Sequence, residues 1–196
     1  MTTVYKLTDA AGYTRRGLSG ETLWIPGEWV EVEWGGSLCH TGCLHAYTDP
    51  LLAALMDPVH AGLGSSARLW IADGNVRATA PDKLGCDRLR ILREHESHEV
   101  STAQCARFAI LCGLEVYSDA QWIAWARGWL SGDDRSAAAA YAAADAAYPA
   151  AAAAAAARAA YYAADAAHYA ATAAYYAADA AIDLLALAEQ AILEEP

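Results

Sequence analysis

The stretch Tyr161–Ala181 reads YYAADAA HYAATAA YYAADAA, so one seven-residue pattern occurs three times in succession. Alanine has the highest helix propensity of all residues, and the pattern therefore predicts helix. A period of seven residues favours a left-handed superhelical contact between helices. Small side chains also allow two helix axes to approach closely.

The alanine-rich region extends on both sides of this stretch, over residues 133–196. Pro149 breaks a helix, so we expect one helix near residues 136–148 and a longer one near 150–193. The alanine face should pack on another helix, in the same chain or in a second copy. Two alternatives stay open: the tyrosines are the packed face, or the repeat is low-complexity sequence that only has to stay helical.

The residues that interrupt the alanines form one arc of about 100° on a helical wheel. With the alanines packed inward, this arc faces solvent or a partner. Its members are therefore candidate partner-binding residues: Tyr161, Tyr162, Asp165, His168, Tyr169, Tyr175, Tyr176 and Asp179.

The first hundred residues have strand-like patterns instead. Residues 29–34 alternate between apolar and acidic side chains, which is typical of a half-buried strand. Further short strands are predicted at 4–7, 43–47, 67–72 and 88–93, and Asp49 followed by Pro50 begins a short helix. We expect a β-rich domain over residues 1–100, with a small mixed or antiparallel sheet.

Residues 101–132 return to helical periodicity. Ser101 with Gln104, and Ser118 with Gln121, have the spacing of capping boxes. They predict two amphipathic helices that pack on the β-rich domain. The second carries Trp122, Trp125 and Trp129 along one stripe, which we interpret as core. The fold class is therefore α+β, with domains at 1–100, 101–132 and 133–196.

The chain is acidic, with a net charge of −11 and an isoelectric point near 4.8. Non-specific nucleic-acid binding requires many Lys and Arg residues, so direct nucleic-acid contact is not expected. The first residues lack a signal-peptide pattern, and no apolar run is long enough to span a membrane. Five cysteines, an odd number, then indicate reduced thiols and a cytoplasmic location in the host cell.

Cys39, Cys43 and His45 are the densest set of metal-ligand types in the sequence. A structural zinc site needs four Cys or His ligands, usually with a second close pair. No second pair is present, so we interpret these residues as structural thiols and a hydrogen-bonded histidine. We expect neither a metal nor a cofactor.

The run Gly42-Cys43-Leu44-His45-Ala46-Tyr47-Thr48-Asp49-Pro50 precedes Arg68-Leu69-Trp70-Ile71-Ala72 and Leu89-Arg90-Ile91-Leu92-Arg93-Glu94. Together these segments resemble a family of uncharacterised phage and bacterial proteins that share a G-x-L-H-A strand. Some members of that family carry alanine-rich tails. The resemblance covers roughly residues 3–130 and implies no established activity.

The same order of elements is similar to that of the ADP-ribosyltransferase fold. Tyr47-Thr48 would match the middle motif of that fold, and the candidates for the catalytic glutamate are Glu94, Glu96 and Glu99. The opening strand should carry an Arg or His, but Tyr5-Lys6 stands there. The resemblance implies an NAD-binding enzyme or its degenerate relative.

From these observations we expect a non-enzymatic protein-interaction module encoded by a phage or mobile element. Its partner would be a protein, or a second copy of the chain, bound through the Tyr/Asp/His arc. One specific form is an acidic inhibitor of a CRISPR-type defence complex or of another nucleic-acid-binding complex. The alternative is the ADP-ribosyltransferase-like enzyme. An ice- or surface-binding helix is third, although Thr172 is the only threonine of the repeat.

Overall fold

The structure is a computed structural model that describes residues 1–38, 42–56, 67–96, 100–147, 150–162, 166–178 and 182–193. The chain forms two compact units, Met1–Glu99 and Val100–Pro196. The first is built on an antiparallel sheet and the second is helical, so the predicted α+β class is confirmed.

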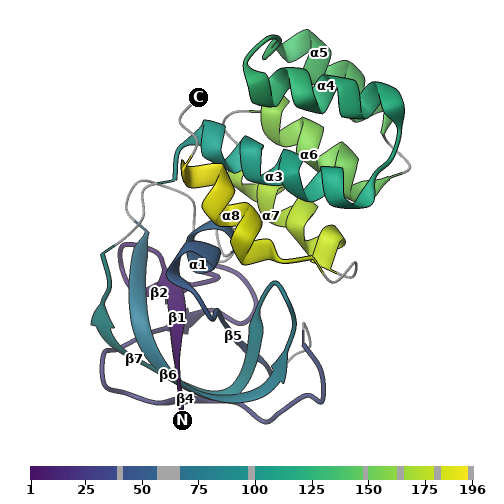
Figure 1. Ribbon diagram of the computed structural model, residues 1–196. Helices are drawn as coiled ribbons and strands as arrows, with labels where there is room; N and C mark the ends of the chain where they lie inside the picture. The colour runs from purple at the N-terminus through teal and green to yellow at the C-terminus, as the bar shows by residue number, and fades with distance from the viewer. Residues whose placement is uncertain are drawn as a thin grey trace. The chain divides into compact units, whose positions relative to one another are not determined.

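The first unit contains a five-stranded antiparallel sheet, ordered β1-β6-β7-β4, with β5 also pairing with β7. Its strands are β1 (Thr2–Thr8), β4 (Val30–Glu31), β5 (Leu44–Ala46), β6 (Arg68–Thr79) and β7 (Leu84–Glu94). A bridge between Tyr5 and Tyr47 joins β1 to the end of β5. The path of the sheet therefore returns to its first strand (Figure 1).

Two smaller elements complete this unit. A two-stranded pair is formed by β2 (Tyr13–Thr14) and β3 (Thr22–Leu23). Helix α1 (Pro50–Met56) packs against β1 and β6, and the Asp49 carboxylate accepts the Leu51 N–H at its start. The helix start predicted at Asp49 and Pro50 is thus confirmed.

Strands β6 and β7 are longer than the sequence predicted, because they pair with each other as a hairpin. They run from Trp70 opposite Glu94 to Thr79 opposite Leu84. Strand β4, in contrast, covers only two residues of the alternating segment 29–34. The length of each strand is decided by its pairing with a neighbouring strand. The side-chain pattern of a single strand carries no information about that pairing.

The core beneath the sheet contains two tryptophans whose indole N–H groups are satisfied by buried threonines. Trp70 Nε1 donates to Thr8 Oγ1 at 3.0 Å, and Trp24 Nε1 donates to Thr14 Oγ1 at 2.9 Å. Buried polar groups of this kind are stabilising only when they are paired. These two hydrogen bonds place both rings within the core.

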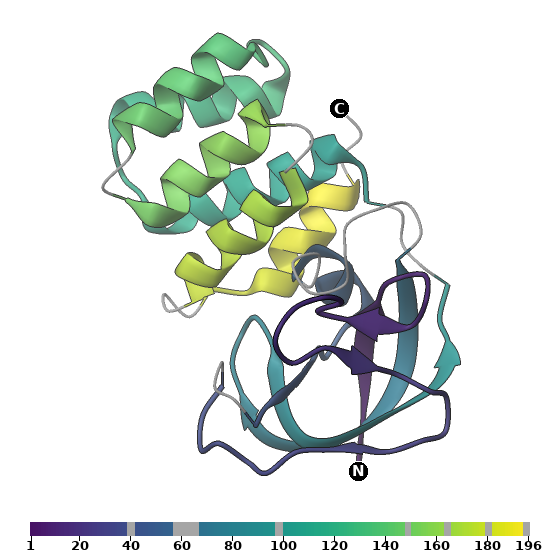
Figure 2. The ribbon, with the colours of Figure 1, turned by 180° about the vertical axis from the view of Figure 1, so that it is seen from behind.

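The second unit consists of short helices that pack side by side (Figure 2). They are α3 (Thr102–Val116), α4 (Ala120–Ser131), α5 (Ala137–Ala146), α6 (Ala151–Tyr161), α7 (Ala166–Ala177) and α8 (Leu184–Leu193). Helix α3 packs against α4, α6, α7 and α8, while α5 packs against α4 and α6. Of the helices that the structure describes, none has both the length and the apolar character needed to cross a bilayer.

The single long helix predicted near 150–193 is wrong. Helix α6 ends at Tyr161, and Tyr162 has φ −96° and ψ 82°, outside the helical region. Helices α6 and α7 pack against each other and against α3 instead. Short helices gain most of their stability from such packing, and here the alanine faces are buried because the chain turns back onto itself.

Residues 101–132 contain α3 and α4, which belong to the helical unit. Within that unit, α3 contacts α6, α7 and α8. The Ser101 capping box is confirmed by both of its hydrogen bonds to Gln104. The predicted Ser118 cap is wrong, because Asp119 is the N-cap and accepts the Gln121 and Trp122 N–H groups.

Candidate functional site

The aromatic residues of α7 lie opposite its buried alanines. Ala170, Ala173 and Ala177 are completely buried, on the side where α7 packs on α3 and α6. Tyr175 and Tyr176 are 49% and 50% exposed. The alanines therefore form the packed face, and the alternative with these tyrosines inside is wrong.

Tyr162, Tyr169, Tyr175 and Tyr176 define what we call the tyrosine face. Tyr162 is exposed and stacks on Tyr169, with ring centroids 5.7 Å apart and planes 26° apart. Tyr175 and Tyr176 meet edge to face at 5.4 Å. Each ring thus contacts another member, and aromatic pairs of this geometry hold both partners in place.

Four further residues belong to the predicted arc: Tyr161, Asp165, His168 and Asp179. Asp165 and Asp179 lie outside the described residues. Tyr161 is the last residue of α6 and His168 lies in α7, but the positions of their side chains are not described.

The helical unit carries most of the net negative charge of the protein. Residues 100–196 contain eleven Asp and Glu residues and four Arg residues, which leaves a net charge of −7. Such an excess produces a negative potential that attracts basic partners and repels nucleic acid.

The candidate zinc ligands lie on or beside β5. Cys43 and His45 flank Leu44, and β5 pairs His45 with Gly85 of β7. A Cβ atom added at Gly85 would lie 2.9 Å from Cys43 Sγ, so this thiol packs directly on β7. Cys39 lies outside the described residues. Among the residues that are described, no three His, Cys, Asp or Glu side chains come together as a metal site.

Two of the candidate transferase residues differ in exposure. Tyr47 is 3% exposed, and its backbone exchanges both hydrogen bonds with Tyr5. Glu94 lies at the end of β7 on the surface, where Arg68 binds both of its carboxylate oxygens at 2.8 and 3.1 Å. Tyr47 is therefore part of the strand pairing, and Glu94 is part of a surface ion pair whose hydrogen bonds lower the pKa of its carboxyl.

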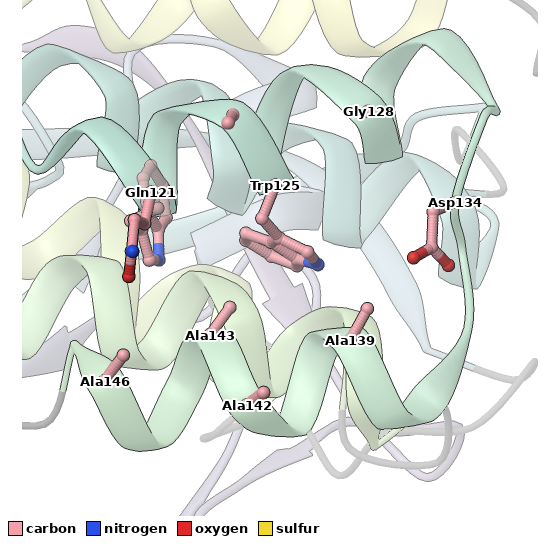
Figure 3. A pocket seen from close by; sticks show the side chains of 10 residues that line it. Gln121, Trp125, Gly128, Asp134, Ala139, Ala142, Ala143 and Ala146 are labelled. Atoms are coloured by element: carbon pink, nitrogen blue, oxygen red, sulfur yellow. The ribbon is translucent and has the colours of Figure 1, made fainter.

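A groove between α4 and α5 was not predicted from the sequence. Its volume is about 410 Å³, and one of its walls is made only of alanines of α5. Figure 3 shows the Trp125 indole extending from α4 toward these alanines, with Gln121 at one end of the groove and Asp134 near the other.

The tryptophan stripe of α4 divides between core and groove. Trp122 and Trp129 are buried, as predicted, whereas Trp125 is only partly buried and lines the groove together with one side of Trp122. The sequence reasoning did not identify α5 as the helix that packs beside α4. Alanine side chains on α5 are too short to cover an indole ring, so they leave space beside it.

Neither a family model nor a curated protein nor a solved structure matches this chain.

Proposed function

We propose that this protein is a protein-interaction module that binds a partner protein with a basic surface through the tyrosine face. The observation that carries the proposal is the difference between the two sides of α7. Its alanines are buried in the helical unit while Tyr175 and Tyr176 remain about half exposed. Residues selected only for helix formation would not need aromatic rings on the outer side.

Tyrosine is suited to this role because its ring supplies a large contact area with only two rotatable side-chain bonds. The stacked pair of Tyr162 and Tyr169 and the edge-to-face pair of Tyr175 and Tyr176 restrict the rings further. Restricted rings lose less conformational entropy when a partner binds. The hydroxyl groups at the ring edges can exchange hydrogen bonds with a polar rim.

The net charge of −7 on residues 100–196 supports a basic partner surface. Opposite charges accelerate the encounter of two proteins and disfavour acidic competitors. A protein that binds nucleic acid carries such a surface, so occlusion of that surface is the specific activity that we propose. A host defence complex of the CRISPR type would be one target of this kind.

The test compares two variants in a pull-down from host-cell lysate, followed by affinity measurement with the purified partner. Replacing Tyr162, Tyr175 and Tyr176 together by Ser should weaken binding by at least about 100-fold, because central aromatic residues commonly dominate an interface. Tyr141 of α5 is 56% exposed and lies outside the tyrosine face, so Tyr141→Ser is the matched control.

Retention of a basic protein by the wild type and by Tyr141→Ser, but not by the triple variant, would support the proposal. Equal retention by the triple variant would contradict it, and so would the absence of any retained protein. Sedimentation of the purified chain distinguishes a second copy as partner, since self-association would then be lost in the triple variant.

A further inference from the structure

The groove between α4 and α5 combines an open alanine wall with two indole rings. Trp122 and Trp125 line its α4 side, and their ring centroids lie 5.5 Å apart with the planes tilted by 59°. The four lining residues contributed by α5 are Ala139, Ala142, Ala143 and Ala146. A volume of about 410 Å³ is sufficient for one long side chain together with part of its backbone.

Both indole N–H groups are buried without a hydrogen-bond acceptor among the described residues. Trp122 is 2% exposed, so its Nε1 cannot turn outward to bulk water. A buried donor without a partner lowers stability, and native structures contain few of them. Because both N–H groups are buried, a ligand in the groove meets the indole rings and not these donors.

The charge at the groove is negative. Among the described residues that line it, Asp134 alone is ionisable, and it stands on the segment that connects α4 to α5 (Figure 3). The backbone N–H of Ser136 donates to Asp134 at 2.9 Å and lowers the pKa of that carboxyl. The site therefore offers a carboxylate and two aromatic rings.

An arginine side chain in a peptide segment suits both features. A guanidinium group stacks on indole rings, with attraction from the ring quadrupole. It also forms a charge-assisted hydrogen bond with a carboxylate.

We propose that the α4–α5 groove binds an arginine side chain of a protein or peptide, with Asp134 pairing with the guanidinium and the indoles of Trp122 and Trp125 contacting the segment. This site is separate from the tyrosine face, which lies at the end of α6 and on α7. Each can therefore fail or succeed independently of the other.

The experiment titrates the ¹⁵N-labelled full chain with the capped peptide acetyl-Gly-Arg-Gly-amide and follows the seven indole N–H signals. The signals of Trp122 and Trp125, assigned with single Trp→Phe variants, should shift and saturate, while the other five stay in place. A capped peptide with citrulline in place of arginine has nearly the same shape without the charge. The citrulline peptide should bind at least about tenfold more weakly, since both the ion pair and the cation–π contact are lost.

Four variants localise the binding. Asp134→Asn should weaken the arginine peptide about tenfold, whereas Asp133→Asn removes the same charge one residue away and should not. Ala142→Leu places a larger side chain in the groove and should abolish the indole shifts, with unchanged circular dichroism. The triple tyrosine variant should bind the peptide as the wild type does.

Absence of saturable indole shifts at millimolar peptide would overturn the proposal. Equal affinity for the citrulline peptide would show that the groove does not recognise a cation. Equal losses in Asp133→Asn and Asp134→Asn would reduce the effect to the general negative charge of the chain, which also contradicts a specific site.

Discussion

Gly113 of α3 is the position where the helical unit can be tested most sharply. A Cβ atom added there would lie 2.6 Å from Cη2 and 3.1 Å from Cζ2 of Trp122, and 3.3 Å from Cβ of Ala156. Trp122 is 2% exposed and cannot move aside into solvent. The absence of a side chain at Gly113 is therefore what allows α4 to bring its indole onto α3.

Two effects of Gly113→Ala oppose each other. Alanine in a helix interior is favoured over glycine by about 1 kcal/mol. Inserting a methyl group into a packed contact costs about 1–3 kcal/mol. The cost of the overlap should exceed the gain in helix propensity, so we expect a net loss of about 1 kcal/mol in the free energy of unfolding of the helical unit.

Gly128 of α4 provides the matched control, because an added Cβ atom there meets no atom within 4 Å. Gly128→Ala should therefore stabilise the unit by up to about 1 kcal/mol. Urea unfolding, followed by circular dichroism at a helical wavelength, measures both changes.

A double-mutant cycle identifies the cause. Phenylalanine has no atoms in the positions of Cη2 and Cζ2, so Trp122→Phe should remove most of the overlap. In that background, Gly113→Ala should become neutral or stabilising, with a coupling energy of about 2 kcal/mol. If Gly113→Ala stabilises the wild type as much as Gly128→Ala does, or if the coupling is below about 0.5 kcal/mol, the close α3–α4 contact is refuted.

Two further predictions concern the helix start at Asp119 and the buried thiols. Asp119→Ala should lower the free energy of unfolding by about 1 kcal/mol, because its carboxylate accepts two N–H groups of the first turn. Ser118→Ala should have little effect, and equal losses in urea unfolding would contradict the assignment of the cap. Burial raises the pKa of Cys105 to about 11 and of Cys86 to about 12, and it also raises the pKa of Cys112. Since only the thiolate reacts, iodoacetamide at pH 8 should label these three far more slowly than the partly buried Cys43, as read by peptide mass spectrometry. A group whose pKa is raised by folding stabilises the fold below its unfolded pKa, near 9.0 for a thiol. Stability should therefore fall as the pH rises from about 9 toward 12, and a flat urea midpoint over that range would contradict the burial.

The sequence predicted those parts of the fold that depend on local patterns. The Ser101 box, the Asp49-Pro50 helix start and the position of the strands follow from hydrogen bonds or side-chain alternation within a few residues. The ends of β6 and β7, and the turn of the chain after Tyr161, depend on partners far away in the sequence. A heptad pattern of alanines is equally compatible with one long helix and with short helices that pack on each other.

The same distinction between local patterns and contacts distant in the sequence applies to the candidate surfaces. The sequence predicted that Tyr175 and Tyr176 lie opposite an alanine face of one helix, but it left open which of the two faces is packed. The groove could not be predicted, since it results from the meeting of tryptophans on α4 with alanines on α5. Each helix by itself has an ordinary amphipathic or alanine-rich sequence, and only their adjacency creates the space.

The pairing of β1 with β6 has a consequence for synthesis on the ribosome. Thr2 pairs with Gly74, and Trp70 binds Thr8 across 62 residues of sequence. Because β1 cannot pair until β6 has been made, the first unit has high contact order and should fold slowly. The helical unit faces a similar delay, since α8 packs on α3, and Gln104 donates to Ile192 O across 88 residues. Until then the nascent chain carries unpaired strand edges and exposed tryptophans, which makes it a substrate for chaperones during translation.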